Sequence, residues 1–95
     1  MGDINTDIIL TILDRSKLEF AGIFGSRARS DARPDSDLDL LVRFKEPLGL
    51  LKLASMQREL SLKLGVMVDL VTEGALSPFL KGEIMKDLKP IYGKR

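Results

Sequence analysis

Two aspartates, Asp37 and Asp39, stand at alternate positions of the apolar run DLDLLV. Alternate residues of an extended strand point to the same face, so the two carboxylates would lie side by side and repel each other. Their repulsion predicts that a positive group sits between them. Carboxylate oxygens are hard ligands that suit Mg²⁺, so a divalent cation is the first interpretation of this pattern.

A third aspartate has the matching position on a later run. VMVDLVT, residues 66–72, places Asp69 on one face, with Val68 and Leu70 on the other. If this strand lies beside the strand that carries Asp37 and Asp39, three carboxylates converge on one patch of a sheet. Such a patch is strongly anionic unless divalent cations occupy it.

The tripeptide Gly25-Ser26-Arg27 follows the apolar run LEFAGIF and supplies groups of the opposite kind. A glycine lets the backbone approach a ligand closely, and a helical turn that begins at Ser26 would point free N–H groups at a phosphate. Arg27 can add a charge-assisted contact to the same phosphate. Hydrogen-bond donors for a phosphate, next to carboxylates that can bind a metal, predict a site for magnesium and a nucleoside triphosphate.

The composition removes most other chemistry. The chain has neither Cys nor His, which excludes disulfides, thiolate nucleophiles, serine–histidine catalysis and the usual zinc ligands. A general base must then be a carboxylate, a lysine, a tyrosine or water. The net charge of +1 gives no argument for nucleic-acid binding. Arg29 and Arg33 are interpreted as surface residues rather than ligand-binding ones.

The elements that must position these residues follow from periodicity and turn signals. We expect three helices: one over residues 4–15, one from Pro47 to Gly65, and one that begins at the Ser77-Pro78 cap. We expect strands over residues 18–24, 37–44 and 66–72, and a short edge strand at residues 90–92. The strands at 37–44 and 66–72 should be parallel because a helix connects them, whereas the short link after residue 24 allows an antiparallel pair.

These elements predict an α/β fold with a small mixed sheet of three to four strands and flanking helices. We expect a single domain over residues 1–95, because 95 residues suffice for one compact unit and not for two. The core of so short a chain is modest, which leaves room for a homo- or hetero-oligomer. The sequence has no apolar run of membrane-spanning length and no signal-peptide pattern, so the expected location is the cytoplasm, without a membrane partner.

The spacing of the glycine turn and the two aspartates resembles that of a known protein family. Gly25-Ser26, ten intervening residues and Asp37-x-Asp39 resemble the signature of the DNA polymerase β-like nucleotidyltransferases. The fuller run GSRARSDARPDSDLDLLV, residues 25–42, is similar to the minimal nucleotidyltransferase (MNT) branch, small prokaryotic proteins often paired with a HEPN-domain partner. Ser30 departs from this pattern, since a glycine is common there. The similarity extends over nearly the whole chain.

The resemblance implies roles for the site residues. It implies that Asp37 and Asp39 ligate two Mg²⁺ ions, that Asp69 completes the catalytic ion and helps to deprotonate an acceptor hydroxyl, and that Gly25, Ser26 and Arg27 bind the nucleotide. With ATP as substrate, the acceptor attacks the α-phosphorus and pyrophosphate leaves. In members paired with a HEPN toxin, the family points to an antitoxin that adenylylates a tyrosine of its partner.

Two other functions are open at this stage. The domain could be a non-catalytic binding module that neutralises a partner protein by steric contact, with a vestigial nucleotide site. A transferase that acts on nucleic acid is a weaker alternative, because the net charge is near zero and the chain has no template-binding domain.

Overall fold

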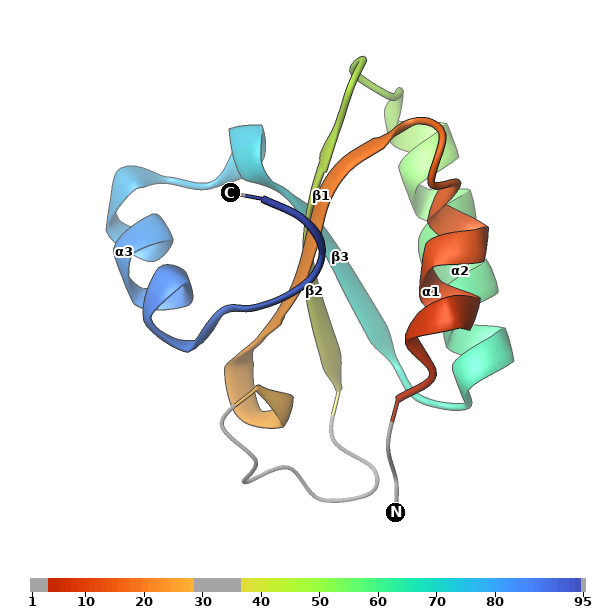
Figure 1. Ribbon diagram of the computed structural model, residues 1–95, viewed down its shortest axis with the longest axis horizontal. Helices are drawn as coiled ribbons and strands as arrows, with labels where there is room; N and C mark the ends of the chain where they lie inside the picture. The colour runs from red at the N-terminus through yellow and green to blue at the C-terminus, as the bar shows by residue number, and fades with distance from the viewer. Residues whose placement is uncertain (1–3, 29–36, 95) are drawn as a thin grey trace.

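The computed structural model describes residues 4–28 and 37–94. Within these ranges the chain forms α1 (Thr6–Leu13), β1 (Leu18–Phe24), the 3₁₀ turn η1 (Gly25–Arg27), β2 (Leu38–Phe44), α2 (Leu50–Leu64), β3 (Val68–Thr72), the 3₁₀ turn η2 (Glu73–Ala75), α3 (Pro78–Asp87) and β4 (Lys89–Gly93). Helices α1 and α2 cover one face of the sheet, and α3 lies on the other side (Figure 1). The expected α/β fold with flanking helices is confirmed.

The helices begin and end where local chemistry requires. The side chain of Asn5 accepts hydrogen bonds from the N–H groups of Asp7 and Ile8 at 3.0 and 3.2 Å, which makes Asn5 the N-cap of α1 and starts this helix two residues later than expected. Ser77 caps α3, with Pro78 in its first turn, as the sequence predicts. Helix α2 ends at Gly65, whose φ of 73° is the left-handed conformation that glycine adopts readily.

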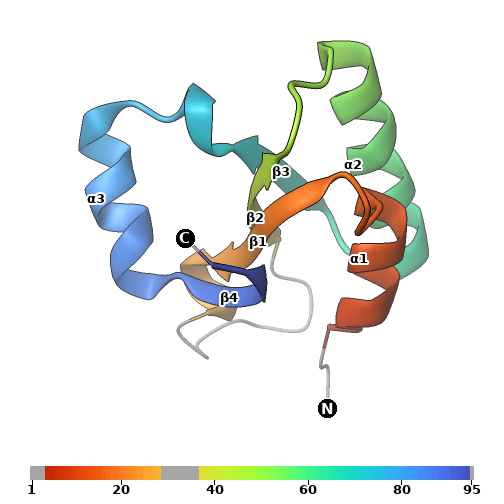
Figure 2. The same ribbon diagram turned by 45° about the horizontal axis from the view of Figure 1, so that its top comes forward.

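The described strands form one mixed sheet with the order β3-β2-β1-β4. Strand β2 pairs antiparallel with β1 and parallel with β3, and β4 pairs antiparallel with the other edge of β1. Figure 2 shows the C-terminal β4 running beside β1. The predicted directions and the short edge strand are therefore confirmed, although β3 begins at Val68 rather than at residue 66.

The main core lies between the sheet and the α1–α2 pair. Its buried members come from both helices and from three strands: Ile9, Leu10, Leu13, Leu18, Ala21, Leu38, Leu40, Val42, Met56, Leu60 and Val68. A register irregularity between Leu18 and Phe20 interrupts strict alternation in β1, so Phe20 does not belong to this cluster although it is fully buried. Because the core takes Leu38 and Leu40 of β2, the intervening Asp39 faces the opposite side.

Helix α3 contributes little to this core. None of its residues is buried, and Phe79 and Leu80 are 91% and 57% exposed. Ile84 is only partly buried, so this helix packs on the sheet less tightly than α1 and α2. None of the helices in the described ranges is long and apolar enough to cross a bilayer.

Candidate active site

Asp39 and Asp69 are direct neighbours on the sheet. They occupy the same register position of the parallel strands β2 and β3, which lie about 4.8 Å apart in a sheet of ordinary spacing. Asp39 is half-buried and Asp69 is exposed. Asp37 is exposed and immediately precedes β2. The shared face that the sequence predicts for Asp39 and Asp69 follows from this register.

The carboxylates act on one another electrostatically. Burial raises the pKa of the Asp39 carboxyl above its usual value, and the negative charges of Asp69 and then Asp37 raise it further. The raised pKa means that ionised Asp39 is less stable here than in water. A cation beside Asp39 would remove this cost, so the chemistry of the donor set fits a divalent metal.

The side chains of the described residues do not form a preassembled set of three metal ligands. Among residues 4–28 and 37–94, no group of three or more Asp, Glu, His or Cys side chains is close enough together to hold a metal ion. Asp39 and Asp69 are the two carboxylates that the sheet register places side by side. The assignment of Asp37, Asp39 and Asp69 as ligands of Mg²⁺ stays a prediction.

Gly25 lies against Asp39. A Cβ atom built on Gly25 would be 2.5 Å from Oδ2 of Asp39, and the φ of Gly25 is +79°. Any other residue would be strained here and would collide with the carboxylate. The pairing of Phe24 with Asp39 on the antiparallel strands explains the contact, since Gly25 follows Phe24 directly. The end of β1 and the start of β2 thus meet at this carboxylate.

The turn η1 carries the other predicted ligand-binding residues. It begins at Gly25 and closes with a 3.1 Å hydrogen bond from the N–H of Ala28 to the carbonyl of Gly25. Ser26 and Arg27 are partly exposed on this turn, which starts beside Asp39. The helical turn expected after Gly25 is present. Arg29, Ser30 and Arg33 lie outside the described residues.

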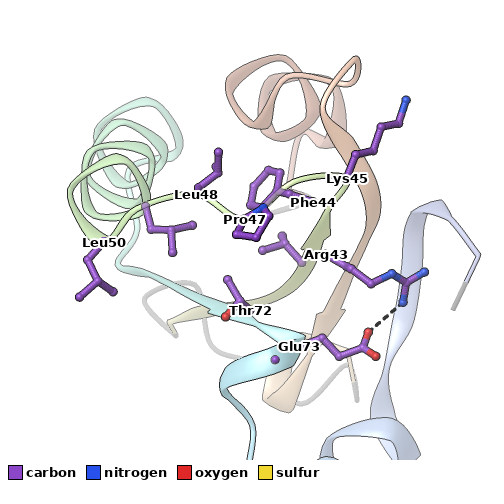
Figure 3. A pocket seen from close by; sticks show the side chains of 11 residues that line it. Arg43, Phe44, Lys45, Pro47, Leu48, Leu50, Thr72 and Glu73 are labelled. Atoms are coloured by element: carbon purple, nitrogen blue, oxygen red, sulfur yellow. Dashed lines mark hydrogen bonds and ion pairs between the residues drawn. The ribbon is translucent and has the colours of Figure 1, made fainter.

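A surface cavity of about 510 Å³ lies at the C-terminal ends of β2 and β3, the strands that carry Asp39 and Asp69 (Figure 3). Its lining includes Phe44 and Thr72 at the ends of β2 and β3, Glu73 in η2, Leu48 in the loop before α2, and Leu50 at the start of α2. Asp39 and Asp69 lie near the beginnings of their strands. The cavity therefore does not belong to the carboxylate site.

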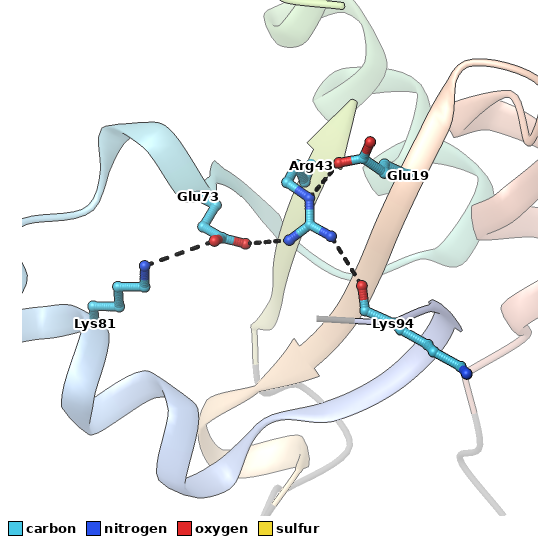
Figure 4. Close-up of polar contacts among 5 residues, drawn as sticks. All are labelled: Glu19, Arg43, Glu73, Lys81 and Lys94. Atoms are coloured by element: carbon cyan, nitrogen blue, oxygen red, sulfur yellow. Dashed lines mark hydrogen bonds and ion pairs between the residues drawn. The ribbon is translucent and has the colours of Figure 1, made fainter. Parts of the chain in front are cut away.

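Arg43 is a polar residue for which the sequence pattern predicts no role. It shares the face of Asp39 and joins segments that are far apart in the chain (Figure 4). Its guanidinium donates hydrogen bonds to Glu19 at 2.5 Å, to Glu73 at 2.9 Å and to the Lys94 carbonyl at 2.9 Å. It also lies 5.7 Å from the centre of the buried Phe20 ring. Its position on the Asp39 face was the available sequence signal, but its partners were not predictable.

A mixed sheet with a glycine turn packed against paired carboxylates is the arrangement expected of a nucleotidyltransferase. The family model described as "Nucleotidyltransferase domain" matches residues 7–91. A protein of Methanocaldococcus jannaschii named "Putative protein adenylyltransferase MJ1217" is 40% identical over 76 residues, which cover 79% of this chain and 78% of that protein.

Solved structures agree with this classification. One described as "Structure of putative minimal nucleotidyltransferase" has a TM-score of 0.75 and 40% identity, with 90% of this chain and 87% of that chain covered. A chain from the complex of a tri-AMPylated HEPN toxin of Shewanella oneidensis with an MNT antitoxin has a TM-score of 0.78 at 24% identity, covering 99% and 74%. The second likeness concerns the fold alone.

This chain belongs to the nucleotidyltransferase family and, within it, to the minimal nucleotidyltransferases. The resemblance drawn from residues 25–42 is confirmed, as is the expectation of an enzyme of the nucleotidyltransferase class.

Proposed function

We propose that this chain is a Mg²⁺-dependent protein adenylyltransferase that moves AMP from ATP to a tyrosine hydroxyl of a HEPN-type partner, and so acts as an antitoxin. The observation that carries the proposal is the junction of Gly25, Asp39 and Asp69, where a turn suited to phosphate meets two neighbouring carboxylates. The M. jannaschii relative is named as a putative protein adenylyltransferase, and the S. oneidensis complex contains a tri-AMPylated HEPN toxin.

In the proposed reaction, the acceptor oxygen forms a bond to the α-phosphorus while the bond between that phosphorus and the β-phosphate oxygen breaks. Pyrophosphate leaves with the electrons of the broken bond, and the hydroxyl proton passes to a carboxylate, for which Asp69 is the candidate because it is exposed beside Asp39. Ser26 and Arg27 would hold the triphosphate through the backbone N–H groups of η1 and the guanidinium. Mg²⁺ bound by Asp37, Asp39 and Asp69 would neutralise phosphate charge.

The direct test is transfer of label from α-³²P-ATP with Mg²⁺, using the chain together with its co-purifying partner. The matched control is the Asp37→Asn/Asp39→Asn double variant, which keeps side-chain shape and removes two charges. We expect label on the partner with the unmodified chain and none with the variant. Substitution of the labelled tyrosine by phenylalanine should then abolish labelling.

The same experiment separates the proposal from steric neutralisation. Labelling that persists in the double variant would overturn the assigned roles of Asp37 and Asp39. If no label appears although the complex forms, and the double variant neutralises the partner as well as the unmodified chain, the protein acts as a binding module.

A further inference from the structure

Strand β3 is an edge of the described sheet, with β2 on one side only. An edge strand presents a row of unpaired backbone groups, which allows it to fray or to shift. Asp69 lies on this strand, so the position of its carboxylate relative to Asp39 depends on how firmly β3 is held. The hydrogen bonds on the outer side of β3 are therefore relevant to the site.

Two side chains of α2 bind the outward-facing amides of β3. The N–H of Val68 donates to Oγ of Ser61 at 3.0 Å, and the N–H of Leu70 donates to Oε1 of Gln57 at 2.9 Å. These amides belong to the residues immediately before and after Asp69. The backbone is thus anchored to α2 on both sides of the aspartate, and both hydrogen bonds are partly buried.

We call the pair Gln57 and Ser61 the α2 clamp. The distance between these two side chains along α2 is close to the distance between the two amides that they bind on β3. Gln57 and Ser61 are four residues apart on a helix and so lie on one face, separated by about 6 Å along the axis. Val68 and Leu70 are two residues apart on a strand, about 6.6 Å. The short connection through Gly65 keeps Ser61 near the start of β3, where a short side chain suffices. The longer glutamine reaches the strand further along.

We propose that Gln57 and Ser61 are positioning residues for Asp69. By fixing the amides of Val68 and Leu70, they hold β3 in the register that sets Asp69 opposite Asp39. The inference rests on the proposed function in assigning Asp69 to metal binding and proton transfer. Partners that orient metal ligands indirectly typically change metal affinity or activity by about 10- to 100-fold when they are removed.

The test uses a matched series on α2. Ser61→Ala removes the acceptor, Ser61→Thr keeps a hydroxyl, and Gln57→Leu removes the other acceptor at similar size. Ser55→Ala makes the same chemical change as Ser61→Ala at an exposed position of α2. We expect the Mg²⁺ concentration for half-maximal transfer to rise about tenfold or more in Ser61→Ala and Gln57→Leu, and to stay within about twofold in Ser61→Thr and Ser55→Ala.

A purely structural role would lower the melting temperature of Ser61→Ala and Gln57→Leu without changing their Mg²⁺ dependence, and that result would overturn the inference. A second measurement does not require activity. Amide hydrogen exchange of Asp69, whose neighbours Val68 and Leu70 donate to these two side chains, should accelerate about tenfold or more in the same two variants and not in Ser55→Ala. Unchanged exchange at Asp69 would contradict the clamp, even if the unmodified chain transferred no AMP and the proposed function had failed.

Discussion

Gly25 and Asp39 are packed so closely that a single methyl group on the glycine would lie 2.5 Å from the carboxylate oxygen Oδ2. The contact joins the end of β1 to the start of β2, and it exists because Phe24 is the cross-strand partner of Asp39. The glycine of the sequence signature therefore has two physical roles. It adopts a positive φ, and it leaves room for the Asp39 carboxylate, which we propose binds the metal ion.

Gly25→Ala should lower the rate of transfer about 100-fold while the fold survives. The substitution adds backbone strain of about 1–2 kcal/mol at the φ of +79° and pushes Asp39 from its position. Displacement of a reacting group by about 1 Å can lower the rate about 100-fold. Single-turnover labelling of the partner measures the loss, and circular dichroism checks the fold.

Gly82→Ala is the control for that variant. Gly82 lies within α3, and a Cβ there would meet no atom within 4 Å other than the neighbouring backbone of its own helix. We expect unchanged transfer and a gain in stability of about 0.5–1 kcal/mol, because alanine is the better helix former. Full activity of Gly25→Ala would show that the contact with Asp39 has no role in the reaction.

Asp39→Asn should stabilise the metal-free protein while removing transfer. The raised pKa of Asp39 means that its negative charge opposes folding at neutral pH, through burial and through repulsion by Asp69 and Asp37. Because the side chain is only partly buried, we expect a gain of no more than about 1 kcal/mol after solvent screening. Urea unfolding without divalent ions measures this gain.

Added Mg²⁺ and ATP should reverse the order of the two proteins. A ligand that binds only the folded state raises its stability, so the unmodified chain should gain stability with Mg²⁺ and ATP, and Asp39→Asn should gain less. An equal gain in both proteins would argue that Asp39 does not hold the metal–nucleotide complex.

Acid should weaken the junction between α1 and β1 through Asp14. The side chain of Asp14 accepts hydrogen bonds from the hydroxyl and the N–H of Ser16, at 2.6 and 3.1 Å, and these bonds lower the pKa of Asp14. A lowered folded-state pKa contributes stability that is present above the unfolded pKa of about 3.9 and is lost as the pH falls through the folded value.

Ser16→Ala tests this assignment because it removes the hydroxyl donor. The variant should be less stable than the unmodified chain at pH 7, and the difference should shrink as the pH falls below about 4. Urea midpoints at several pH values measure it. A difference that stays constant across this range would show that the charge of Asp14 is not involved.

The sequence predicted the local parts of this molecule better than the distant ones. The strand with Asp39 was recognisable because alternation of apolar and charged residues is a local pattern, and the parallel neighbour with Asp69 followed from the helix between them. The interruption in β1 near Phe20 was not predictable, because its cause lies in how two strands fit together.

Arg43 shows the limit of that reasoning most clearly. Its partners Glu73 and Lys94 are 30 and 51 residues away along the chain, so no periodicity links them. The same holds for the contacts of Gln57 and Ser61 with β3, which appear only after α2 is packed against that strand. Local pattern thus predicted which face holds the carboxylates, and the fold revealed what supports them.

The Arg43 network predicts a distinct response to substitution. Arg43→Ala should destabilise the protein by about 1–2 kcal/mol, since the side chain is 31% exposed and its ion pairs are partly screened. Arg43→Lys should recover less than half of that loss, because an ammonium cannot reproduce the planar fork that reaches Glu19, Glu73 and the Lys94 carbonyl together. The free energy of unfolding in urea measures both variants.

The loss should be concentrated at the C-terminal edge of the sheet. Since Arg43 holds the Lys94 carbonyl next to the end of β4, the amides of Ile91 and Tyr92 should exchange faster in Arg43→Ala, while those of β3 should change much less. Uniform acceleration throughout the sheet would instead indicate that Arg43 contributes only to global stability. Full recovery by lysine would show that its positive charge, and not the geometry of the guanidinium, stabilises this edge.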